Sequence, residues 1–146
     1  MPNYVSLFSG AGVGCYGFKK EKYQCLVTNE LLEKRLEIQK FNQICDNKDG
    51  YILGDITDNK NKKKLDNLLF NTSIDVVIAT PPCQGMSVAN HKKNNELKRN
   101  SLVVESINIV DKYRPKYFIF ENVPSFLKTI CTDNDMVNKS ILDAID

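Results

Sequence analysis

The sequence contains no tryptophan, one histidine and no pair of cysteines spaced as CxxC. Its five cysteines are an odd number spread along the chain, so neither a disulfide framework nor a zinc site is expected, and no metal site is predicted. Free thiols are typical of a reducing compartment, which favours the cytoplasm.

The sequence also lacks long apolar runs and a strong excess of one charge. No stretch approaches the roughly 20 apolar residues that a membrane-spanning helix needs. The first residues, Met1 to Tyr4, do not have the pattern of a signal peptide. The net charge of +2 does not by itself indicate a polyanionic partner, and lysine clusters such as residues 60–64 are more often solvated faces. We therefore expect one globular domain without membrane contact.

Five short apolar segments alternate with segments of helical character, which is typical of an α/β fold with a mostly parallel, doubly wound sheet. The helix expected over residues 31–42 has apolar residues at three-to-four spacing, which predicts that Leu32, Leu36 and Ile38 turn inward. The predicted strands cover residues 4–8, 24–28, 51–53, 75–79 and 116–120. Further helices are predicted over residues 15–20, in a lysine-rich segment ending at residue 70, and over residues 102–113, 126–130 and 136–145, with a polar loop over 88–100.

A glycine-rich turn, residues 9–14, follows the first predicted strand and precedes a helix. Such a turn brings bare backbone close to a ligand. Gly12, Gly14 and Gly17 match GxGxxG, although an ordinary tight turn explains them as well. Glu30 follows Gly10 by twenty positions, which is close to the spacing at which an acidic residue meets ribose hydroxyls. The alternative is a glutamate at the start of a helix, favoured by the helix dipole.

Two further polar residues follow predicted strands. Asp55 could accept a hydrogen bond from the amino group of a base, or it could cap the lysine-rich helix. Glu121 ends the fifth strand, where we expect a partly desolvated carboxyl group that can hold a proton; a solvated glutamate is the alternative. Because the carboxyl ends of parallel strands share one edge of the sheet, these residues should lie near the glycine turn.

Cys83 follows the fourth strand after two prolines. Neither proline has an N–H for the sheet, and each restrains the residue before it to an extended conformation. The thiol should therefore stand on a stiff turn at the ligand-binding edge, which makes it a candidate nucleophile. A cysteine can equally be a small apolar filler in a loop, and both interpretations stay open on this evidence alone.

Taken together, these segments resemble the amino-terminal part of the cytosine-C5 DNA methyltransferases of bacterial restriction–modification systems. The resemblance covers nearly the whole chain, and the combination of Pro-Cys-Gln with Glu-Asn-Val is specific. The matching segments, in the family's order, are Leu7–Gly12, Thr28–Glu30, Gly54–Thr57, Pro81–Gln84, Arg99–Leu102 and Phe120–Val123.

The resemblance implies a Rossmann-like methyltransferase fold and transfer of a methyl group from S-adenosylmethionine to carbon 5 of cytosine in duplex DNA. Cys83 would add to carbon 6 of a base flipped out of the duplex, and Glu121 would contact the ring. Glu30 would bind the ribose, Asp55 the adenine amino group, and Leu31 and Ile56 the adenine ring. The full set of implied cofactor-binding residues is Phe8, Gly10, Ala11, Gly12, Glu30, Leu31, Asp55, Ile56 and Leu102.

Two departures from the family's pattern matter. Leu97 stands where the family usually has aspartate, two residues before the arginine of the Arg-Asn segment. The family's later motifs and its target-recognition domain are not found in residues 1–146, so we expect a partial catalytic domain of about five strands, inactive alone, for which a complementary C-terminal chain is one explanation. A tRNA cytosine-C5 methyltransferase and a non-catalytic remnant that binds the cofactor are the alternatives. A nicotinamide-dependent dehydrogenase would leave Cys83 and Glu121 unexplained.

Overall fold

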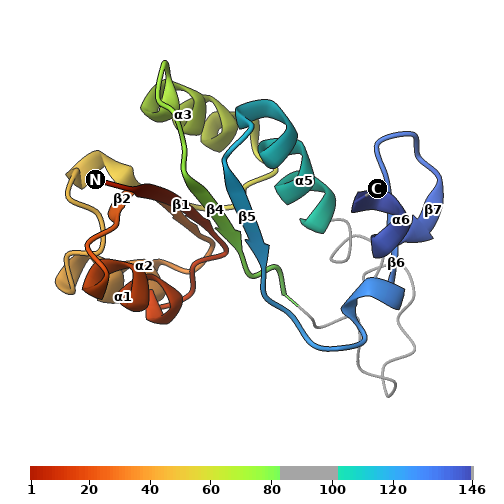
Figure 1. The fold of residues 1–146 in the computed structure, drawn as a ribbon, viewed down its shortest axis with the longest axis horizontal. Helices are drawn as coiled ribbons and strands as arrows, with labels where there is room; N and C mark the ends of the chain where they lie inside the picture. The colour runs from red at the N-terminus through yellow and green to blue at the C-terminus, as the bar shows by residue number, and fades with distance from the viewer. Residues whose placement is uncertain (83–101, 146) are drawn as a thin grey trace.

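A parallel five-stranded sheet forms the centre of the protein (Figure 1). The computed structural model describes residues 1–82 and 102–145. The strand order is β3-β2-β1-β4-β5, so the first strand lies in the middle and the chain winds outward in both directions. The predicted α/β class and doubly wound parallel sheet are confirmed. The strands are β1 (Asn3–Leu7), β2 (Gln24–Glu30), β3 (Tyr51–Leu53), β4 (Val76–Ala79) and β5 (Tyr117–Phe120).

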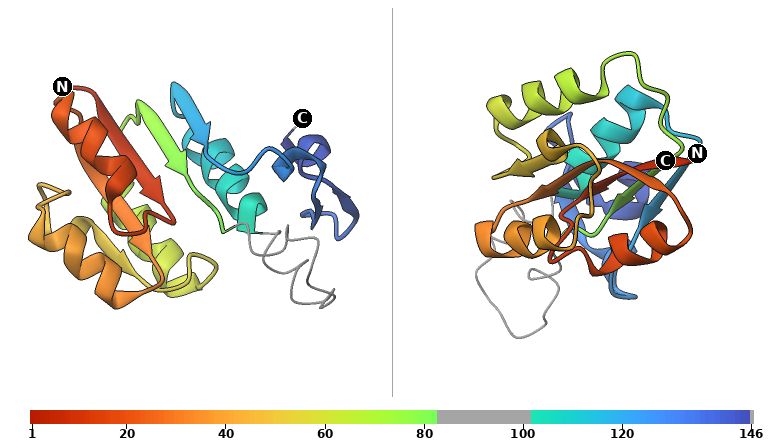
Figure 2. Two further views of the ribbon diagram at one scale, coloured as in Figure 1. Left: turned by 90° about the horizontal axis from the view of Figure 1, so that it is seen from below. Right: turned by 90° about the vertical axis from the view of Figure 1, so that its left-hand side faces the viewer.

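Helices cover the sheet from both sides (Figures 1 and 2). The helices α1 (Val13–Lys20) and α2 (Glu33–Phe41) lie on one face, and α3 (Asn59–Leu69) and α5 (Leu102–Tyr113) lie on the other. A single 3₁₀ turn, η1 (Lys48–Gly50), precedes β3. None of the helices within the described residues is long and apolar enough to cross a membrane.

Each face of the sheet has its own apolar core, because successive side chains of a strand point to opposite faces. Val5, Leu7 and Val77 pack with Leu65 of α3 and Ile109 of α5. On the opposite face, Tyr4, Cys25 and Val76 pack with Cys15 of α1 and Leu36 of α2. Both central strands, β1 and β4, therefore contribute to both cores, which fixes the positions of the loops that leave their carboxyl ends.

One helix face was predicted incorrectly. Leu36 is buried as expected, but Leu32 is 48% exposed and Ile38 is 47% exposed. The residue of α2 that shares the inward face with Leu36 is Gln39, three positions later, which is fully buried. A buried amide needs hydrogen-bond partners, and the glycine turn supplies them, as described below.

The carboxyl-terminal part of the described chain folds beyond α5 (Figure 2). Instead of the predicted helix over 136–145, it contains the antiparallel strands β6 (Ile130–Thr132) and β7 (Asn138–Ser140), followed by the short α6 (Ile141–Ile145). The predicted helix over 126–130 is a single 3₁₀ turn, η2 (Phe126–Lys128). The hairpin forms because Met136 has a positive φ of 63°, and Asp135 accepts the backbone N–H of Val137 at 2.9 Å, which closes a tight turn.

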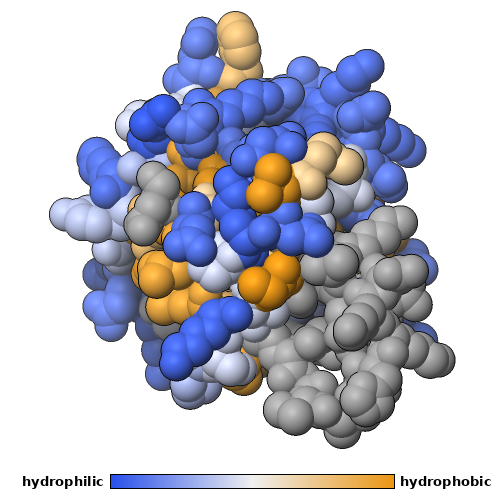
Figure 3. Space-filling view, turned by 90° about the vertical axis from the view of Figure 1, so that its right-hand side faces the viewer, coloured by the Kyte–Doolittle hydropathy of each residue, from blue (hydrophilic) through white to orange (hydrophobic). Residues whose placement is uncertain are grey.

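The last strand of the sheet is much more exposed than its sequence suggests. The predicted buried strand at this place is instead an edge strand, in which Tyr117 is 70%, Phe118 49% and Ile119 43% exposed. Figure 3 shows further hydrophobic side chains standing at the surface on the side of the molecule that carries β6, β7 and α6. Among the described residues, nothing pairs with the outer edge of β5.

Candidate active site

The glycine turn after β1 adopts a backbone that few residues accept. Phe8, Gly10 and Gly12 have φ values of 56°, 57° and 84°. Positive φ is uncommon for a residue with a Cβ, so Phe8 carries local strain, of the kind that is often found at binding sites. A Cβ added to Gly10 would meet no atom within 4 Å, so open space lies beside this residue. A Cβ on Gly12 would lie 3.0 Å from Cγ of Gln39, so the turn packs closely on α2.

Glu30, at the end of β2, is 4% exposed and holds the glycine turn. Its Oε2 accepts the N–H of Gly10 at 2.8 Å, and its Oε1 accepts the N–H of Leu32 at 2.9 Å. Arg35 lies 3.9 Å from the same carboxylate. The sequence leaves two interpretations of Glu30 open, a glutamate at the start of a helix and a ribose-binding residue beside the glycine turn. Its position is compatible with both, because it binds backbone at the start of α2 and also binds the turn. Each carboxylate oxygen can accept a further hydrogen bond, which leaves capacity for a ligand hydroxyl.

The loop after β3 is tied to β2 by a side-chain amide. Nδ2 of Asn29 donates to the carbonyl oxygens of Ile52 at 3.3 Å and Gly54 at 3.0 Å. Asp55 is exposed, and its Oδ1 accepts the backbone N–H and the hydroxyl of Thr57. Its Oδ2 has no hydrogen-bond partner among the described residues. The loop thus presents one free carboxylate oxygen of Asp55 beside the end of β2.

The two apolar residues expected to flank an adenine ring differ sharply. Leu31 is 62% exposed and offers a free apolar face next to Glu30. Ile56 is 1% exposed and packs in the core with Leu65 and Leu69 of α3, so its side chain supports the loop from below. Leu102, the first residue of α5, is half-buried, and Ala11 is half-buried within the glycine turn.

The loops after β4 and β5 are joined by direct hydrogen bonds. The N–H of Glu121 donates to the carbonyl oxygen of Ala79 at 3.1 Å, and Nδ2 of Asn122 donates to that of Pro81 at 3.0 Å. Thr80 donates its hydroxyl to the carbonyl oxygen of Phe8 at 2.8 Å, which connects the same loop to the glycine turn. The three segments thus meet at one edge of the sheet.

The candidate catalytic pair is Cys83 and Glu121, of which the structure describes only Glu121. Glu121 is exposed rather than partly desolvated, because β5 lies at the open edge of the sheet. Cys83, the polar loop over 88–100 and the segment Arg99–Ser101 lie outside the described residues. The chain is described as far as Pro82, one residue before Cys83.

The four cysteines within the described residues are buried, which makes them poor nucleophiles. Burial raises the pKa of the thiols of Cys15 and Cys131. Sγ of Cys25 lies 3.2 Å from Sγ of Cys45, and the hydrogen bond between them raises the pKa of Cys25 and lowers that of Cys45. Within residues 1–82 and 102–145, no cluster of three or more His, Cys, Asp or Glu could hold a metal ion.

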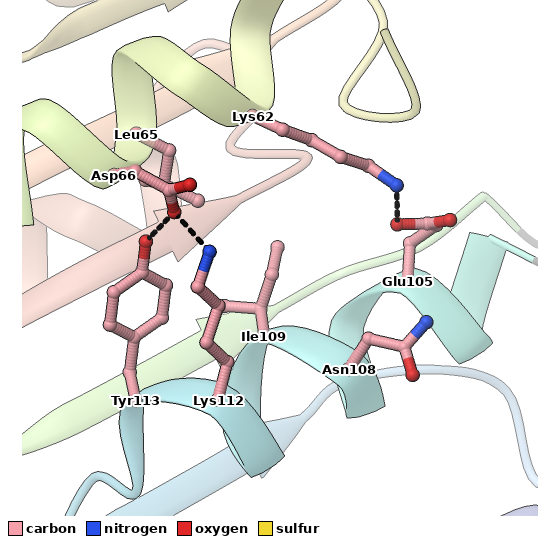
Figure 4. A pocket seen from close by; sticks show the side chains of 8 residues that line it. All are labelled: Lys62, Leu65, Asp66, Glu105, Asn108, Ile109, Lys112 and Tyr113. Atoms are coloured by element: carbon pink, nitrogen blue, oxygen red, sulfur yellow. Dashed lines mark hydrogen bonds and ion pairs between the residues drawn. The ribbon is translucent and has the colours of Figure 1, made fainter. Parts of the chain in front are cut away.

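A groove of about 200 Å³ lies between α3 and α5 (Figure 4). Its polar groups already bind one another: Lys62 pairs with Glu105 at 2.7 Å, and Asp66 binds both Lys112 and Tyr113. Burial and the Asp66 hydrogen bond raise the pKa of Tyr113. These polar groups therefore bind α3 and α5 to each other, and no residue of the glycine turn lines the groove.

Sequence reasoning did not identify one member of the site, Gln39. Its Nε2 donates to Oγ of Ser9 at 2.8 Å and to the carbonyl oxygen of Gly10 at 2.6 Å. The signal was the position of a polar residue three places after Leu36, on the inward face of α2. Helix periodicity alone does not distinguish such a residue from a solvated one.

Comparison with known proteins identifies the family of the chain. Residues 3–144 match the family model for C-5 cytosine-specific DNA methylases, which is nearly the whole chain. The chain belongs to this family. Among relatives in the methylase family, the Type II methyltransferase M1.HgaI of Avibacterium volantium is 37% identical, over 95% of this chain and 40% of its own length. M.HindV of Haemophilus influenzae is 33% identical, over 94% of this chain and 42% of its own length.

These methylase relatives are considerably longer than the chain, which spans about two fifths of their length. Among solved structures, a candidate DNA modification methyltransferase encoded within an E. coli prophage superposes with a TM-score of 0.58. It is 23% identical, and the match covers 87% of this chain and 33% of that chain, so it supports the methylase fold alone.

Proposed function

We propose that the chain forms the cofactor-binding and nucleophile-bearing part of a DNA (cytosine-5) methyltransferase, of the kind found in restriction–modification systems. The observation that carries the proposal is the convergence of three family motifs at one edge of the sheet. Thr80 binds Phe8 of the glycine turn, and Asn122 binds Pro81 of the loop that leads to Cys83. A cofactor bound at the turn, a thiol at residue 83 and the carboxyl group of Glu121 would thus serve one small volume.

The described residues fit S-adenosylmethionine. The space beside Gly10 suits the methionine portion, and the spare lone pairs of Glu30 suit ribose hydroxyls. Asp55 keeps one carboxylate oxygen for the adenine amino group, and exposed Leu31 offers an apolar surface for the ring. Phe8, Ala11, Gly12 and Leu102 would shape the walls of the site, and Ile56 would support the Asp55 loop from the core. When bound, the cofactor supplies an electrophilic methyl group.

The chain's own residues would activate the base, because carbon 5 of cytosine is a poor nucleophile. Addition of the Cys83 sulfur to carbon 6 makes carbon 5 electron-rich. An ordinary cysteine is only a few per cent thiolate at neutral pH, so this step needs help. Glu121 would provide it by donating a proton to N3 of the ring as negative charge develops there, once a segment that covers β5 has desolvated its carboxyl group. After methylation, a solvent base removes the proton from carbon 5, the Cys83 thiolate leaves carbon 6, and N3 returns its proton to the Glu121 carboxylate, which restores the aromatic ring.

The target base must leave the duplex, because carbon 6 is inaccessible within the stack. Unstacking costs a few kcal/mol, which contacts to the base and to phosphates offset. We propose that the DNA sequence is recognised by a segment other than these 146 residues, since none of them resembles the family's target-recognition domain.

The exposed strand β5 supports a second element of the proposal, a further polypeptide segment that completes the catalytic domain. Tyr117 and Ile119 expose one face of the strand, and Phe118 exposes the other. Strands of parallel sheets are normally covered on both faces and reach such exposure only where neighbours are absent. The longer relatives contain more than enough additional chain to cover this edge. The segment belongs either to the same polypeptide or to a complementary chain, and we propose that activity requires it.

Two measurements test the proposal. Isothermal titration of the chain with S-adenosylmethionine should show binding, and titration with NADH should not. Incubation with S-adenosylmethionine and a duplex containing 5-fluorocytosine should trap a covalent adduct at Cys83 once the missing segment is supplied, since fluorine cannot leave as a proton does. The variant Cys83→Ser should bind the cofactor and form no adduct.

Other outcomes point to the alternatives. An adduct with 5-fluorocytosine in tRNA but not in duplex DNA would assign the substrate to RNA. Cofactor binding without an adduct on either nucleic acid, in the completed protein, would leave a chain that only binds the cofactor. Absence of cofactor binding in the completed protein would overturn the proposal.

A further inference from the structure

Gln39 is the one fully buried polar residue of α2 and lies directly beneath the glycine turn. Its amide nitrogen reaches two groups of the turn, Oγ of Ser9 at 2.8 Å and the carbonyl oxygen of Gly10 at 2.6 Å. Ser9 in turn donates its hydroxyl to the carbonyl oxygen of Asn29 at 3.0 Å. The amide thus connects α2, the turn and the end of β2.

The remaining atom of this amide is unusual. Oε1 of Gln39 is buried and has no hydrogen-bond partner among residues 1–82 and 102–145. Exchanging the oxygen and nitrogen would not improve the arrangement, because the carbonyl oxygen of Gly10 needs a donor. A methionine would fill a similar volume without the unpaired oxygen, but it would leave the carbonyl oxygen of Gly10 without this donor, so the amide is explained by the bonds that its nitrogen gives to the turn.

The glycine turn needs such a support because its own conformation is demanding. Gly10 and Gly12 have positive φ. The N–H of Gly10 donates to Glu30, and the carbonyl oxygen of Gly10 accepts from Gln39. Gly12 packs on the aliphatic part of Gln39 and on Ile44, at 3.0 and 3.2 Å from where a Cβ would stand. The peptide groups on both sides of Gly10 are therefore held, one by a carboxylate and one by an amide.

We propose that Gln39 is a positioning residue, which holds the peptide after Gly10 in the orientation that S-adenosylmethionine requires, at the expense of an unpaired buried oxygen. The inference rests on the proposed function, because it concerns the same cofactor site. It assigns to α2 a direct role in cofactor affinity, although Gln39 itself is buried beneath the turn and does not reach the open space beside Gly10.

The experiment compares Gln39→Met with the matched control Lys40→Met, an exposed position on the same helix. Titration with S-adenosylmethionine should show about tenfold weaker binding for Gln39→Met, which corresponds to about 1.4 kcal/mol. Lys40→Met should bind as the wild type does. The melting temperature of Gln39→Met should fall by no more than a few degrees, since removal of the unpaired buried oxygen partly offsets the loss of the two donated hydrogen bonds.

A second variant, Gln39→Glu, tests whether the donated hydrogen bond is the cause. A protonated glutamic acid can donate to the carbonyl oxygen of Gly10, whereas a carboxylate repels it. The affinity of this variant for S-adenosylmethionine should therefore rise toward the wild-type value as the pH is lowered from 8 to 5.5. Glu30 and Arg35 are the charged groups that face this turn, and both are present in the wild type, whose titration over the same range serves as the baseline.

The outcomes separate this inference from the proposed function. If the wild-type chain binds no S-adenosylmethionine even with the completing segment present, both the proposed function and the role of Gln39 are overturned. Wild type that binds, together with a Gln39→Met variant that binds equally well, overturns the positioning role alone. A large loss of melting temperature in Gln39→Met, with no pH-dependent recovery in Gln39→Glu, would make Gln39 a folding residue only.

Discussion

The side-chain amide of Asn122 donates a hydrogen bond to the carbonyl oxygen of Pro81, 3.0 Å away, across the ends of two neighbouring strands. This bond connects the residue after Glu121 to the loop that leads to Cys83. The two side chains that we propose to act on the base, Cys83 and Glu121, therefore belong to segments that are hydrogen-bonded to each other.

The first prediction follows from this bond. Asn122→Ala should reduce methyl transfer in the completed enzyme by about 100-fold, because small displacements of reacting groups cost that much. S-adenosylmethionine affinity should change less than threefold, since Asn122 is not among the proposed cofactor-binding residues. Steady-state rates and titration measure the two quantities. Asn122→Asp, which cannot donate, should behave like the alanine variant, and normal turnover by either would contradict the assignment.

The second prediction concerns Glu30. Its carboxylate binds the N–H groups of Gly10 and Leu32, so Glu30→Ala should weaken S-adenosylmethionine binding by at least tenfold and also lower the melting temperature. Glu33→Ala, at the exposed first position of α2, serves as the control and should change neither quantity much. Equal affinities for the two variants in titration would rule out a binding role for Glu30.

The third prediction uses Thr80, whose hydroxyl binds the carbonyl oxygen of Phe8. Thr80→Val keeps the shape and removes this bond, so it should lower the free energy of unfolding by about 1 kcal/mol. Thr80→Ser keeps the hydroxyl and should lose less. Urea denaturation of the three proteins provides the values, and a valine variant as stable as wild type would show that the bond contributes nothing.

The fourth prediction concerns acid stability through Asp75. The hydrogen bonds from Lys116 at 2.6 Å and from the N–H of Asn3 at 2.8 Å lower the pKa of Asp75 below its ordinary value of 3.8. A lowered carboxyl pKa stabilises the fold above the ordinary value, and the contribution disappears as the pH falls through the lowered value. Asp75→Asn should therefore melt at a lower temperature than wild type at pH 7, and the difference should shrink as the pH falls below 3.8 and through the lowered pKa of Asp75.

The control for this experiment is Asp58→Asn, because the Asp58 side chain makes no capping hydrogen bond. Its melting temperature should follow that of the wild type at every pH. Asp75 also raises the pKa of Lys116, so the pair remains intact through the alkaline range up to the raised lysine value. A constant gap between wild type and Asp75→Asn from pH 7 down to pH 2 would refute the electrostatic explanation.

The fifth prediction follows from the apolar edge strand. The chain without a covering segment should self-associate as its concentration rises, because β5 exposes apolar side chains and unpaired backbone groups. Ile119→Lys places a charge on that edge and should shift the equilibrium toward monomer. Sedimentation velocity over a hundredfold range of concentration measures the effect. A wild-type chain that stays monomeric throughout would contradict it.

Much of the fold was predictable because short apolar segments and the residues that end them carry the information locally. The glycine turn, Glu30 and Asp55 all follow strands whose periodicity is clear, and the parallel order brings their ends together. The hairpin over residues 130–140 was not predictable in this way, because each strand is only three residues long and its turn depends on a positive φ at Met136.

The exposure of particular side chains was harder to predict than the elements themselves. The apolar sequence of β5 predicts a buried strand that ends in a partly desolvated Glu121, but burial depends on neighbours that lie elsewhere in space. Likewise, Ile56 follows the pattern of a ligand-facing residue and is instead part of the core. Gln39 shows the reverse case, a polar residue whose partners belong to a distant turn.

The side chains of Asn122, Thr80, Ser9 and Asn29 each donate to a carbonyl group at the end of the adjacent strand, so the bonds form a series across the sheet from β5 to β3. A substitution that breaks one of these bonds at the β5 edge can consequently displace the loops of the neighbouring strands, even where the substituted residue contacts no ligand. In a mutational scan for methylation, sensitive positions should therefore form a band across the molecule rather than a shell around the reacting base.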